Sequence, residues 1–366
     1  MIEQQEHQEQ PTQRLDIKKL LKSVMAFKSS DLHLVVGSEP QIRIDKELRA
    51  LNLPVLGAKD IEEMAYSLLE DKQKKRFEEE NELDFSFELK GIGRFRANYY
   101  RTIHGIACAF RMIPIDIPTL DEYGNPPVFK ELVKKEKGLI LVTGPTGSGK
   151  STTLASMLHE INITERRHII TIEDPVEFVH KNEKSLFSQR DVGTNTESFA
   201  TALKYSLRQD PDVILIGEMR DAETIGAALT AAETGHLVFG TLHTNSAPGT
   251  INRIIDVFEG VEQAQIRAQL ASSLVAVISQ TLIPRIGGGK VATQEILITN
   301  PAISNQIRED KVHQIYSQMQ LNQQETKMTT QTQQLLELLQ KNVITKENAV
   351  KNSNRPDELM KLMGGF

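Results

Sequence analysis

The stretch that most constrains the fold is GPTGSGKST, because it matches the pattern G-x-x-x-x-G-K-[ST] and lies between an expected buried strand and an expected helix. The fixed places of the pattern are Gly144, Gly149, Lys150 and Ser151. An apolar run, residues 139–142, precedes the loop, and apolar residues at helical spacing follow it over residues 154–161. This order predicts a nucleotide-binding α/β domain, and a chance glycine-rich turn explains the context poorly.

The residues of this loop have distinct expected roles. Glycines let the backbone curl, so that successive N–H groups and the helix N-terminus point at the phosphates of ATP. Lys150 is expected to neutralise charge on the β- and γ-phosphates, and the Ser151 hydroxyl to hold Mg²⁺. The predicted nucleotide-binding residues are Gly144, Pro145, Thr146, Gly147, Ser148, Gly149, Lys150, Ser151 and Thr152.

The 366-residue chain is long enough for about two domains, and its composition changes along its length. The Gln/Glu-rich opening, residues 1–14, has almost nothing to bury and is predicted to be a disordered tail. Alternating strands, of which ELDFSFEL is the clearest, indicate a first domain over residues 15–113. Four prolines and one glycine in PIDIPTLDEYGNPP then predict a linker over residues 114–128.

Beyond the linker, continuous apolar strands alternate with helices over residues 129–300. Such alternation indicates an α/β fold with a mostly parallel sheet and helices on both faces. Strands stop near Pro301, and residues 301–366 are predicted to form a small helical region rich in Gln and Asn.

Charge and cysteine content exclude several classes of protein. A formal charge of −6 and a pI near 5.9 argue against nucleic acid as a partner, although a local basic groove stays open. Cys108 is the only cysteine, which excludes cysteine-rich zinc sites and favours a reducing cytosol. The apolar runs are too short to span a membrane, and the opening residues lack a signal-peptide core. We therefore expect a cytoplasmic protein whose membrane association is peripheral.

Two acidic clusters each follow a buried strand, at the edge where α/β sheets bind their ligands. They lie in IEDPVEF and VILIGEMRD and contain Glu173, Asp174, Glu177, Glu218 and Asp221. Hydrolysis needs one carboxylate to orient and deprotonate water and another to support Mg²⁺. Helix caps and surface ion pairs are the alternatives for any single acid, and position alone does not separate base from metal support.

An arginine pair is predicted in the first domain. If Arg101 and Ile106 close the loop between RFRANYYR and IACAFRMI, one face of this hairpin is wholly apolar. On the other face Arg96 lies opposite Arg111, and an anion between them would relieve their repulsion. Registers shifted by two residues, or a solvated basic face, are the alternatives. As arginine fingers, the two side chains would reach a nucleotide only across an interface.

Two histidines flank a short apolar strand in ETGHLVFGTLHTNSA. Because a strand rises ~3.3 Å per residue and its side chains alternate, His236 and His243 would lie ~23 Å apart on opposite faces. They therefore cannot share one metal ion. His243 falls at the strand end near the phosphate loop, whereas a satisfied histidine at a helix–strand junction explains His236 at least as well.

Together these motifs resemble the secretion-type hexameric ATPases, and within them the type IV pilus retraction ATPases. The resemblance rests on SDLHL, GRFRAN, GPTGSGKSTT, IEDPVEF, LRQDPDVILIGEMRD and TGHLVFGTLHTNSA, and runs from about Leu15 to Phe366. It implies a PAS-like N-terminal α+β domain, followed by a RecA-like P-loop ATPase domain with a helical C-terminal tail. It also implies a homohexamer that hydrolyses ATP with Mg²⁺ and powers pilus retraction on an inner-membrane platform protein.

The resemblance also implies roles for particular residues. Glu177 would be the general base, Glu218 would support Mg²⁺ and water, and His243 would sense the γ-phosphate. Arg96 and Arg111 map onto the family's arginine fingers. The predicted catalytic residues are thus Glu177, Glu218, Lys150, Arg96, Arg111 and His243, and the predicted Mg²⁺ ligands are Ser151 and Glu218, directly or through water.

Two departures bear on the choice within the family. Assembly-type relatives carry a four-cysteine motif and an additional N-terminal domain, and the lack of both favours retraction here. AISNQIRE stands where retraction ATPases have AIRNLIRE, with Ser304 and Gln306 in place of arginine and leucine. A helix that packs through Ile303 and Ile307 is the structural alternative for this element. A type II secretion or DNA-transfer ATPase, a RecA-like DNA motor, a small-molecule kinase and a nucleotide-dependent binding module stay open as alternative functions.

Overall fold

The computed structural model describes residues 15–27, 29–44, 47–113 and 116–364. The chain divides into two compact units between Ile115 and Asp116. The predicted disordered tail and the first two residues of the predicted linker lie outside the described residues. Among the helices that are described, none is long and apolar enough to cross a membrane.

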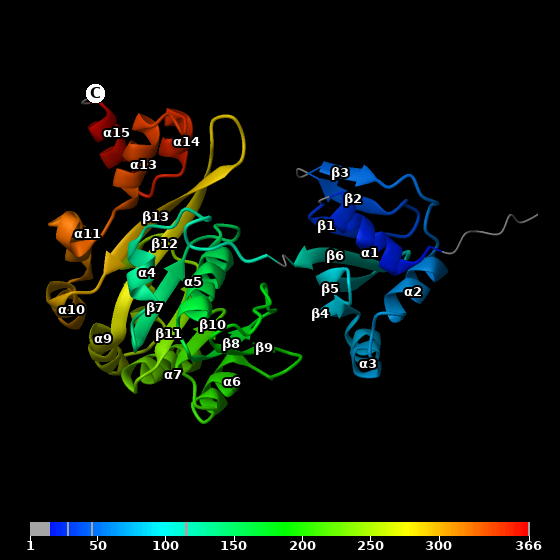
Figure 1. The fold of residues 1–366 in the computed structure, drawn as a ribbon, viewed down its shortest axis with the longest axis horizontal. Coiled ribbons are helices and arrows are strands. Elements are labelled where there is room, and N and C mark those ends of the chain that lie inside the picture. The colour runs from blue at the N-terminus through cyan, green and yellow to red at the C-terminus, as the bar shows by residue number, and fades with distance from the viewer. Residues whose placement is uncertain (1–14, 28, 45–46, 114–115, 365–366) are drawn as a thin grey trace, which may run out of the picture. The chain divides into compact units, whose positions relative to one another are not determined.

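The first unit is an α+β fold built on an antiparallel sheet (Figure 1). Its strands are β1 (Asp31–Leu34), β2 (Gln41–Ile44), β3 (Glu47–Ala50), β4 (Glu82–Leu89), β5 (Gly93–Thr102) and β6 (Gly105–Ile113), in the order β3-β2-β1-β6-β5-β4. Its helices are α1 (Ile17–Ala26), α2 (Ala58–Tyr66) and α3 (Asp71–Glu80). The alternation predicted for ELDFSFEL appears in β4, where Leu83 and Phe85 are buried while Asp84 and Glu88 are exposed.

The hairpin of β5 and β6 has the predicted register. Its pairs include Arg101 with Ile106, Phe95 with Met112, Ala97 with Phe110, and Tyr99 with Cys108. The apolar face joins the core of the unit, because Phe95, Ala97 and Tyr99 have no exposed surface. Arg96 and Arg111 are therefore directly opposite on the other face, and the shifted registers are excluded.

The second unit contains the predicted, mostly parallel sheet. Its strands are β7 (Gly138–Thr143), β8 (His168–Glu173), β9 (Leu186–Asp191), β10 (Val213–Ile216), β11 (Leu237–Leu242), β12 (Leu274–Pro284) and β13 (Lys290–Ile298). They lie in the order β13-β12-β7-β11-β10-β8-β9, and every neighbouring pair except β12–β13 is parallel. The C-terminal ends of six strands therefore meet at one edge of the sheet.

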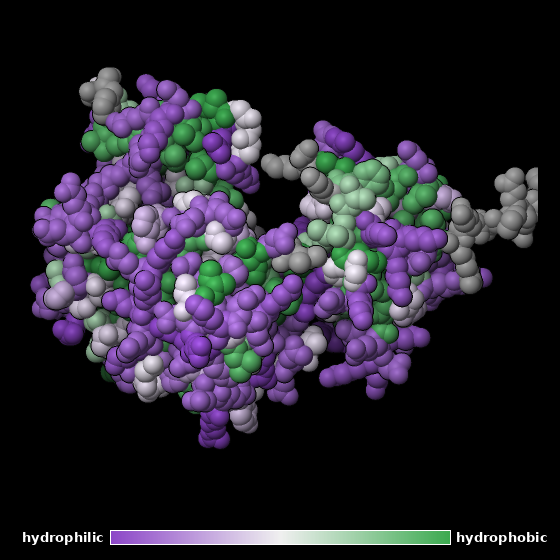
Figure 2. Space-filling view, viewed as in Figure 1, coloured by the Kyte–Doolittle hydropathy of each residue, from purple (hydrophilic) through white to green (hydrophobic). Residues whose placement is uncertain are grey.

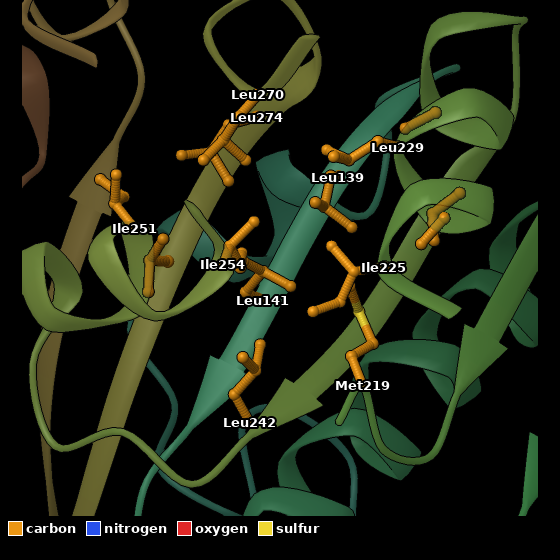
Figure 3. Close-up of a cluster of buried hydrophobic side chains, with 14 of the residues drawn as sticks. Leu139, Leu141, Met219, Ile225, Leu229, Leu242, Ile251, Ile254, Leu270 and Leu274 are labelled. Atoms are coloured by element: carbon orange, nitrogen blue, oxygen red, sulfur yellow. The ribbon is translucent and has the colours of Figure 1, made fainter. Parts of the chain in front are cut away.

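Helices cover both faces of this sheet, which explains the continuous apolar sequence of its central strands. In β7, Leu139 and Leu141 belong to one core cluster, and Ile140 and Val142 belong to another. Helices α4 (Val128–Leu132) and α5 (Lys150–Thr164) pack on the second cluster. The first cluster is covered by α6 (Phe199–Ser206), α7 (Ala222–Glu233), α8 (Ala247–Asp256) and α9 (Glu262–Ser273). Figure 3 shows side chains of α7, α8 and α9 beside Leu139 and Leu141 of β7.

The strands end with β13, and the rest of the described chain is helical, as predicted. Its helices are α10 (Pro301–Arg308), a 3₁₀ turn η1 (Val312–Gln314), α11 (Ile315–Met319), α12 (Gln323–Thr326), α13 (Gln331–Gln340), α14 (Lys346–Lys351) and α15 (Pro356–Met363). The AISNQIRE segment forms most of α10, where Ile303 and Ile307 are fully buried beside α9. Ser304 and Gln306 are partly exposed. The packing role raised for this helix is therefore present in the structure.

Residues 116–127, which the sequence predicts to belong to the linker, cluster with the second unit. Their prolines prevent helix and strand, but Leu120 is 1% exposed and packs with Val128 and Phe129 of α4. One buried leucine thus attaches an otherwise irregular segment to the unit. On the face shown in Figure 2, hydrophilic side chains predominate over the second unit and apolar ones form small separate groups.

Candidate active site

Glycines shape the phosphate loop in two ways. Gly144, Gly147 and Gly149 have φ values of 140°, 76° and 89°, which side chains rarely tolerate. A Cβ on Gly144 would also lie 2.1 Å from the carbonyl oxygen of Gln280, and one on Gly149 would lie 2.5 Å from the hydroxyl of Tyr123. The two fixed glycines are therefore required by close neighbours behind the loop as well as by its curvature.

Lys150 begins α5, a helix of 15 residues whose N-terminus faces the loop. Its Nζ donates to the carbonyl of Gly144 at 2.8 Å and to that of Pro145 at 3.3 Å. Burial lowers the pKa of Lys150, and the negative charges of Glu218 and Glu177 partly oppose this. An ammonium group at a helix N-terminus, bonded only to carbonyls of its own loop, fits phosphate oxygens well.

Glu218 follows β10 and contacts Arg220 and the predicted site residue His243. Its Oε1 accepts hydrogen bonds from Nε of Arg220 and, at 3.0 Å, from Nε2 of His243. Burial raises the pKa of Glu218, but the hydrogen bonds and positive charges of Arg220 and His243 outweigh it and leave the pKa below its ordinary value. Glu218 is therefore an ionised carboxylate at neutral pH, in contact with a histidine from another loop.

Strand register explains why these loops meet. Ile216 of β10 pairs with Gly240 of β11 on one side and with Ile172 of β8 on the other, so the three strands end nearly level. Gly217 follows at once, and a Cβ there would lie 3.1 Å from Cα of Glu173. The two acidic clusters are thus neighbours at the sheet edge that carries the phosphate loop.

The oxygen donors near the phosphate loop are suited to Mg²⁺ bound together with nucleotide, and less suited to a metal ion that protein side chains hold without other ligands. In the ranges that the structure describes, no three His, Cys, Asp or Glu side chains are grouped to hold a metal ion. Mg²⁺ in nucleotide sites is instead held by one or two protein oxygens with water and phosphate. A hydroxyl in the first turn of α5 (Ser151) and the carboxylate of Glu218 are oxygen donors of that kind.

Asp221, from the second acidic cluster, caps a helix. Its Oδ1 accepts from the amide of Thr224 at 2.8 Å, and its Oδ2 accepts from the hydroxyl of the same residue at 3.0 Å. These bonds satisfy the first turn of α7. Asp221 is therefore a helix cap, as one alternative for these acids predicted. Glu218 is the acid of this cluster that lies near Lys150 of the phosphate loop.

Glu177 lies on the exposed turn after β8, and this turn is held by residues that the sequence did not single out. The amide of Val176 donates to Oδ1 of Asp191 at 2.5 Å, and Nε2 of Gln189 donates to the carbonyl of Phe178 at 2.8 Å. Both supporting side chains come from the C-terminal half of β9. Their signal in the sequence is weak, since only the pairing of β8 with β9 brings them to the turn.

Glu173 at the end of β8 titrates near neutrality. Burial raises its pKa to about 7, although the amide of Glu177 donates to Oε2 at 3.3 Å. Because the folded protein binds this proton more tightly than the unfolded chain, stability is lost as pH rises from 4.5 to about 7. We expect Glu173→Gln to be more stable than the parent at pH 8, by at most about 3 kcal/mol, and nearly equal to it at pH 4, below the unfolded pKa of 4.5. Urea unfolding at both pH values measures this, and equal differences at both would contradict it.

The arginine pair of the first unit is balanced by carboxylates. Nε of Arg111 donates to Oδ1 of Asp31 at 2.7 Å, and NH2 of Arg96 lies 4.0 Å from Oδ1 of Asp84. Burial raises the pKa of Asp31, but hydrogen bonds from Arg111 and from the hydroxyl of Ser30 outweigh it and lower the pKa overall. The side chains of Arg96 and Arg111 remain 44% and 68% exposed. The expected relief of repulsion thus comes from aspartates, and both guanidinium groups still face solvent.

His236 is satisfied locally. Its Nδ1 lies 2.9 Å from the carbonyl oxygen of Ala231, at the junction between α7 and β11. His243, at the other end of β11, is the histidine that contacts Glu218. The structure therefore separates the two histidines into a junction residue and a site residue.

Comparisons with known proteins agree along nearly the whole chain. The family model described as "Type II/IV secretion system protein" matches residues 5–360. The chain is 52% identical over 343 residues to the type IV pilus retraction ATPase PilT of Pseudomonas aeruginosa, covering 94% of this chain and 99% of that protein. It is 49% identical to a twitching motility protein of Neisseria gonorrhoeae, over 87% of this chain and 86% of that one.

A solved structure extends the similarity to three dimensions. The crystal structure of the pilus retraction motor PilT with bound ADP matches with a TM-score of 0.90 and 48% identity. The match covers 95% of this chain and 99% of that one. The two-unit α/β architecture is therefore shared along the length of both proteins.

Proposed function

The chain belongs to the type II/IV secretion system protein family and is an ATPase, and we propose that its hydrolysis of ATP powers retraction of type IV pili. The similarity to a PilT protein over nearly the full length of both chains carries this proposal. A phosphate loop with acidic strand ends is common to many motors, so the site alone would not distinguish retraction. The similarity spans the arginine-bearing unit and the C-terminal helices as well as the site.

At the site, the proposed chemistry divides among side chains on separate loops. Lys150 would neutralise phosphate charge, and Glu177 would take the proton from the attacking water. Glu218 would support Mg²⁺ and orient water near the γ-phosphate. His243 would sense whether the γ-phosphate is present, through its hydrogen bond to Glu218. Mg²⁺, when bound by Ser151 and Glu218 directly or through water, would neutralise charge on the β- and γ-phosphates.

Arg96 and Arg111 are proposed to act on nucleotide held by a neighbouring subunit of a homohexamer. The exposed pair of Arg96 with Asp84 contributes little, so phosphate can replace Asp84. Arg111 has an exposed guanidinium that can bind phosphate while its Nε keeps the bond to the buried Asp31. Arginine fingers can be supplied by a neighbouring chain, and they stabilise the charge that develops in the transition state. Closure of the arginine-bearing unit over nucleotide would then be the movement that is converted into work.

The proposed partner is an inner-membrane platform protein of the pilus, and nucleic acid is not expected to take part. The proposed location is the cytoplasmic side of the inner membrane, where the motor associates with the membrane through that partner. The acidic composition favours this over a DNA motor, whose surface would attract phosphate. If turnover of the purified enzyme rises with added DNA, the related DNA-motor function is favoured instead.

Deletion of the gene in the source organism tests the proposed function. We expect the deletion strain to keep surface pili and lose twitching, because assembly continues while subunit removal stops. The parent gene should restore twitching, and Glu177→Gln should not. Pilus counts by electron microscopy and colony spreading at the agar interface measure the two traits. Loss of the pili themselves would contradict retraction and favour assembly.

A further inference from the structure

Gln280 is a buried polar side chain directly behind the phosphate loop. It lies in β12 with 1% of its surface exposed, next to Ser279, which pairs with Thr143 of β7. Earlier in the strand, Ala276, Val277 and Ile278 are buried and apolar. An amide in such a position costs free energy unless its hydrogen bonds are made.

The side chain of Gln280 makes three hydrogen bonds. Its Nε2 donates to the carbonyl of Ser148 at 2.6 Å, within the phosphate loop. Its Oε1 accepts from the hydroxyl of Thr153 at 2.8 Å, in the first turns of α5, and from Nε2 of Gln294 at 3.0 Å. One side chain therefore joins the loop to the helix that follows it.

Close packing shows that the loop is built against this residue. A Cβ on Gly144 would lie 2.1 Å from the backbone oxygen of Gln280, and one on Gly149 would lie 2.8 Å from its Nε2. The carbonyl of Ser148 points back at Gln280, so the N–H of Gly149, in the same trans peptide, points to the opposite side. Support from behind thus keeps the donors of the loop directed at phosphate.

Gln294 extends the connection to two distant segments. It pairs with Gln280 across β12 and β13 and is 4% exposed. Its Nε2 also donates to Oδ1 of Asn125 at 3.0 Å, and its backbone amide donates to Oε1 of Gln334 at 2.6 Å. Asn125 lies in the segment that precedes α4, and Gln334 lies in α13. A continuous set of hydrogen bonds therefore runs from the phosphate loop to both segments.

We propose that Gln280 is a positioning residue for the phosphate loop, and that Gln294 couples the loop to residues 119–126 and to α13. Nucleotide draws the loop amides toward its phosphates, and the peptide of Ser148 cannot turn without moving Gln280. Since each member of the set has few alternative partners in a packed interior, displacement passes along it. The proposal requires nucleotide binding only, so its failure and that of pilus retraction are distinguishable.

Gln280→Met tests the positioning role, because methionine keeps the volume and removes the amide. We expect the Kd for ADP and the KM for ATP to rise about tenfold, the effect of losing about 1.4 kcal/mol of hydrogen bonding, with kcat lowered less than threefold. Thr293→Val is the matched control. Thr293, in β13, is buried like Gln280, but its hydroxyl donates to the carbonyl of Thr281 at 3.2 Å and not to the phosphate loop. A rise of the same size in the control, or an unchanged Kd in folded Gln280→Met, would overturn the proposal.

Gln294→Met tests the coupling, and decides the proposal if Gln280→Met does not fold. Hydrogen exchange with and without saturating ADP is the measurement. In the parent, ADP should slow exchange over residues 119–126 and in α13 as well as in the loop. In Gln294→Met, the loop should remain protected while the change at the two distant segments is lost. Equal ADP-dependent protection of those segments in both proteins would refute the coupling.

Discussion

Glu177→Gln is expected to lower kcat for ATP hydrolysis by about 10²–10⁴-fold, because glutamine cannot accept the proton of the attacking water. Binding should survive, since the loop and Lys150 are the proposed phosphate-binding groups, and the turn that carries Glu177 is fixed by Asp191 and Gln189 through backbone groups. Steady-state phosphate release and ADP affinity together measure the two effects. The variant should bind ADP as the parent does.

Glu183→Gln supplies the matched control for this variant. Glu183 is exposed a few residues further along, and its backbone amide, not its carboxylate, donates to Asn162 at 3.1 Å. Its replacement should leave turnover within twofold of the parent. If Glu177→Gln turns over as fast as this control, the general base is another group, and Glu173 is then the nearest candidate at the end of β8.

Loss of both exposed arginines should have the largest effect of all. The double variant Arg96→Gln, Arg111→Gln is expected to lower turnover by about 10³-fold or more, which is the size of effect that arginine fingers have in general. Nucleotide affinity should fall much less, because the guanidinium groups would act on transition-state charge. Arg49→Gln is the control, since Arg49 is 56% exposed on β3 of the same unit and pairs only loosely with Glu47, at 3.6 Å.

Mixing two inactive variants distinguishes action within a subunit from action on a neighbour. Lys150→Gln subunits lack a working phosphate loop but keep both arginines, whereas the double arginine variant keeps the loop and lacks the arginines. If the arginines act across the subunit interface, mixed oligomers regain turnover that neither variant shows alone. If they act on nucleotide in their own subunit, the mixture stays inactive. Co-expression with two affinity tags isolates the mixed oligomers for this assay.

Several features were predictable because they depend on residues close together in sequence. The phosphate loop follows from a short pattern, and the three φ values above explain why glycine occupies it. Alternation predicts which face of the β5–β6 hairpin is apolar, since any odd shift would turn Phe95 and Tyr99 toward water, whereas shifts of two residues are excluded only by the observed pairing. The parallel sheet follows from apolar strands that alternate with helices, because both of its faces are buried.

Functional roles were less accessible from sequence where one residue type serves several purposes. Asp221 and Glu218 belong to the same acidic cluster, yet one caps α7 and the other contacts His243. Local helix chemistry predicts a cap for either, and only the neighbouring strand shows which acid faces the loop. For the opposed Arg96 and Arg111, the sequence suggests that an anion between them would relieve their repulsion. Their aspartate partners became visible only when β1 and β4 were placed beside the hairpin.

By itself, the sequence determined the phosphate loop and the parallel α/β class of the second unit, because each depends on periodicity or on a short fixed pattern. It suggested the opposed arginines but left registers shifted by two residues open, and the observed pairing of β5 with β6 decided between them. The tertiary structure decided which side chains support those features. Gln280 reaches Ser148 across 132 positions of sequence, and Asp191 reaches the turn of Glu177 only through the pairing of β8 with β9. A buried amide becomes interpretable when its partners are known, since hydrogen bonds require particular distances and directions that no local pattern encodes.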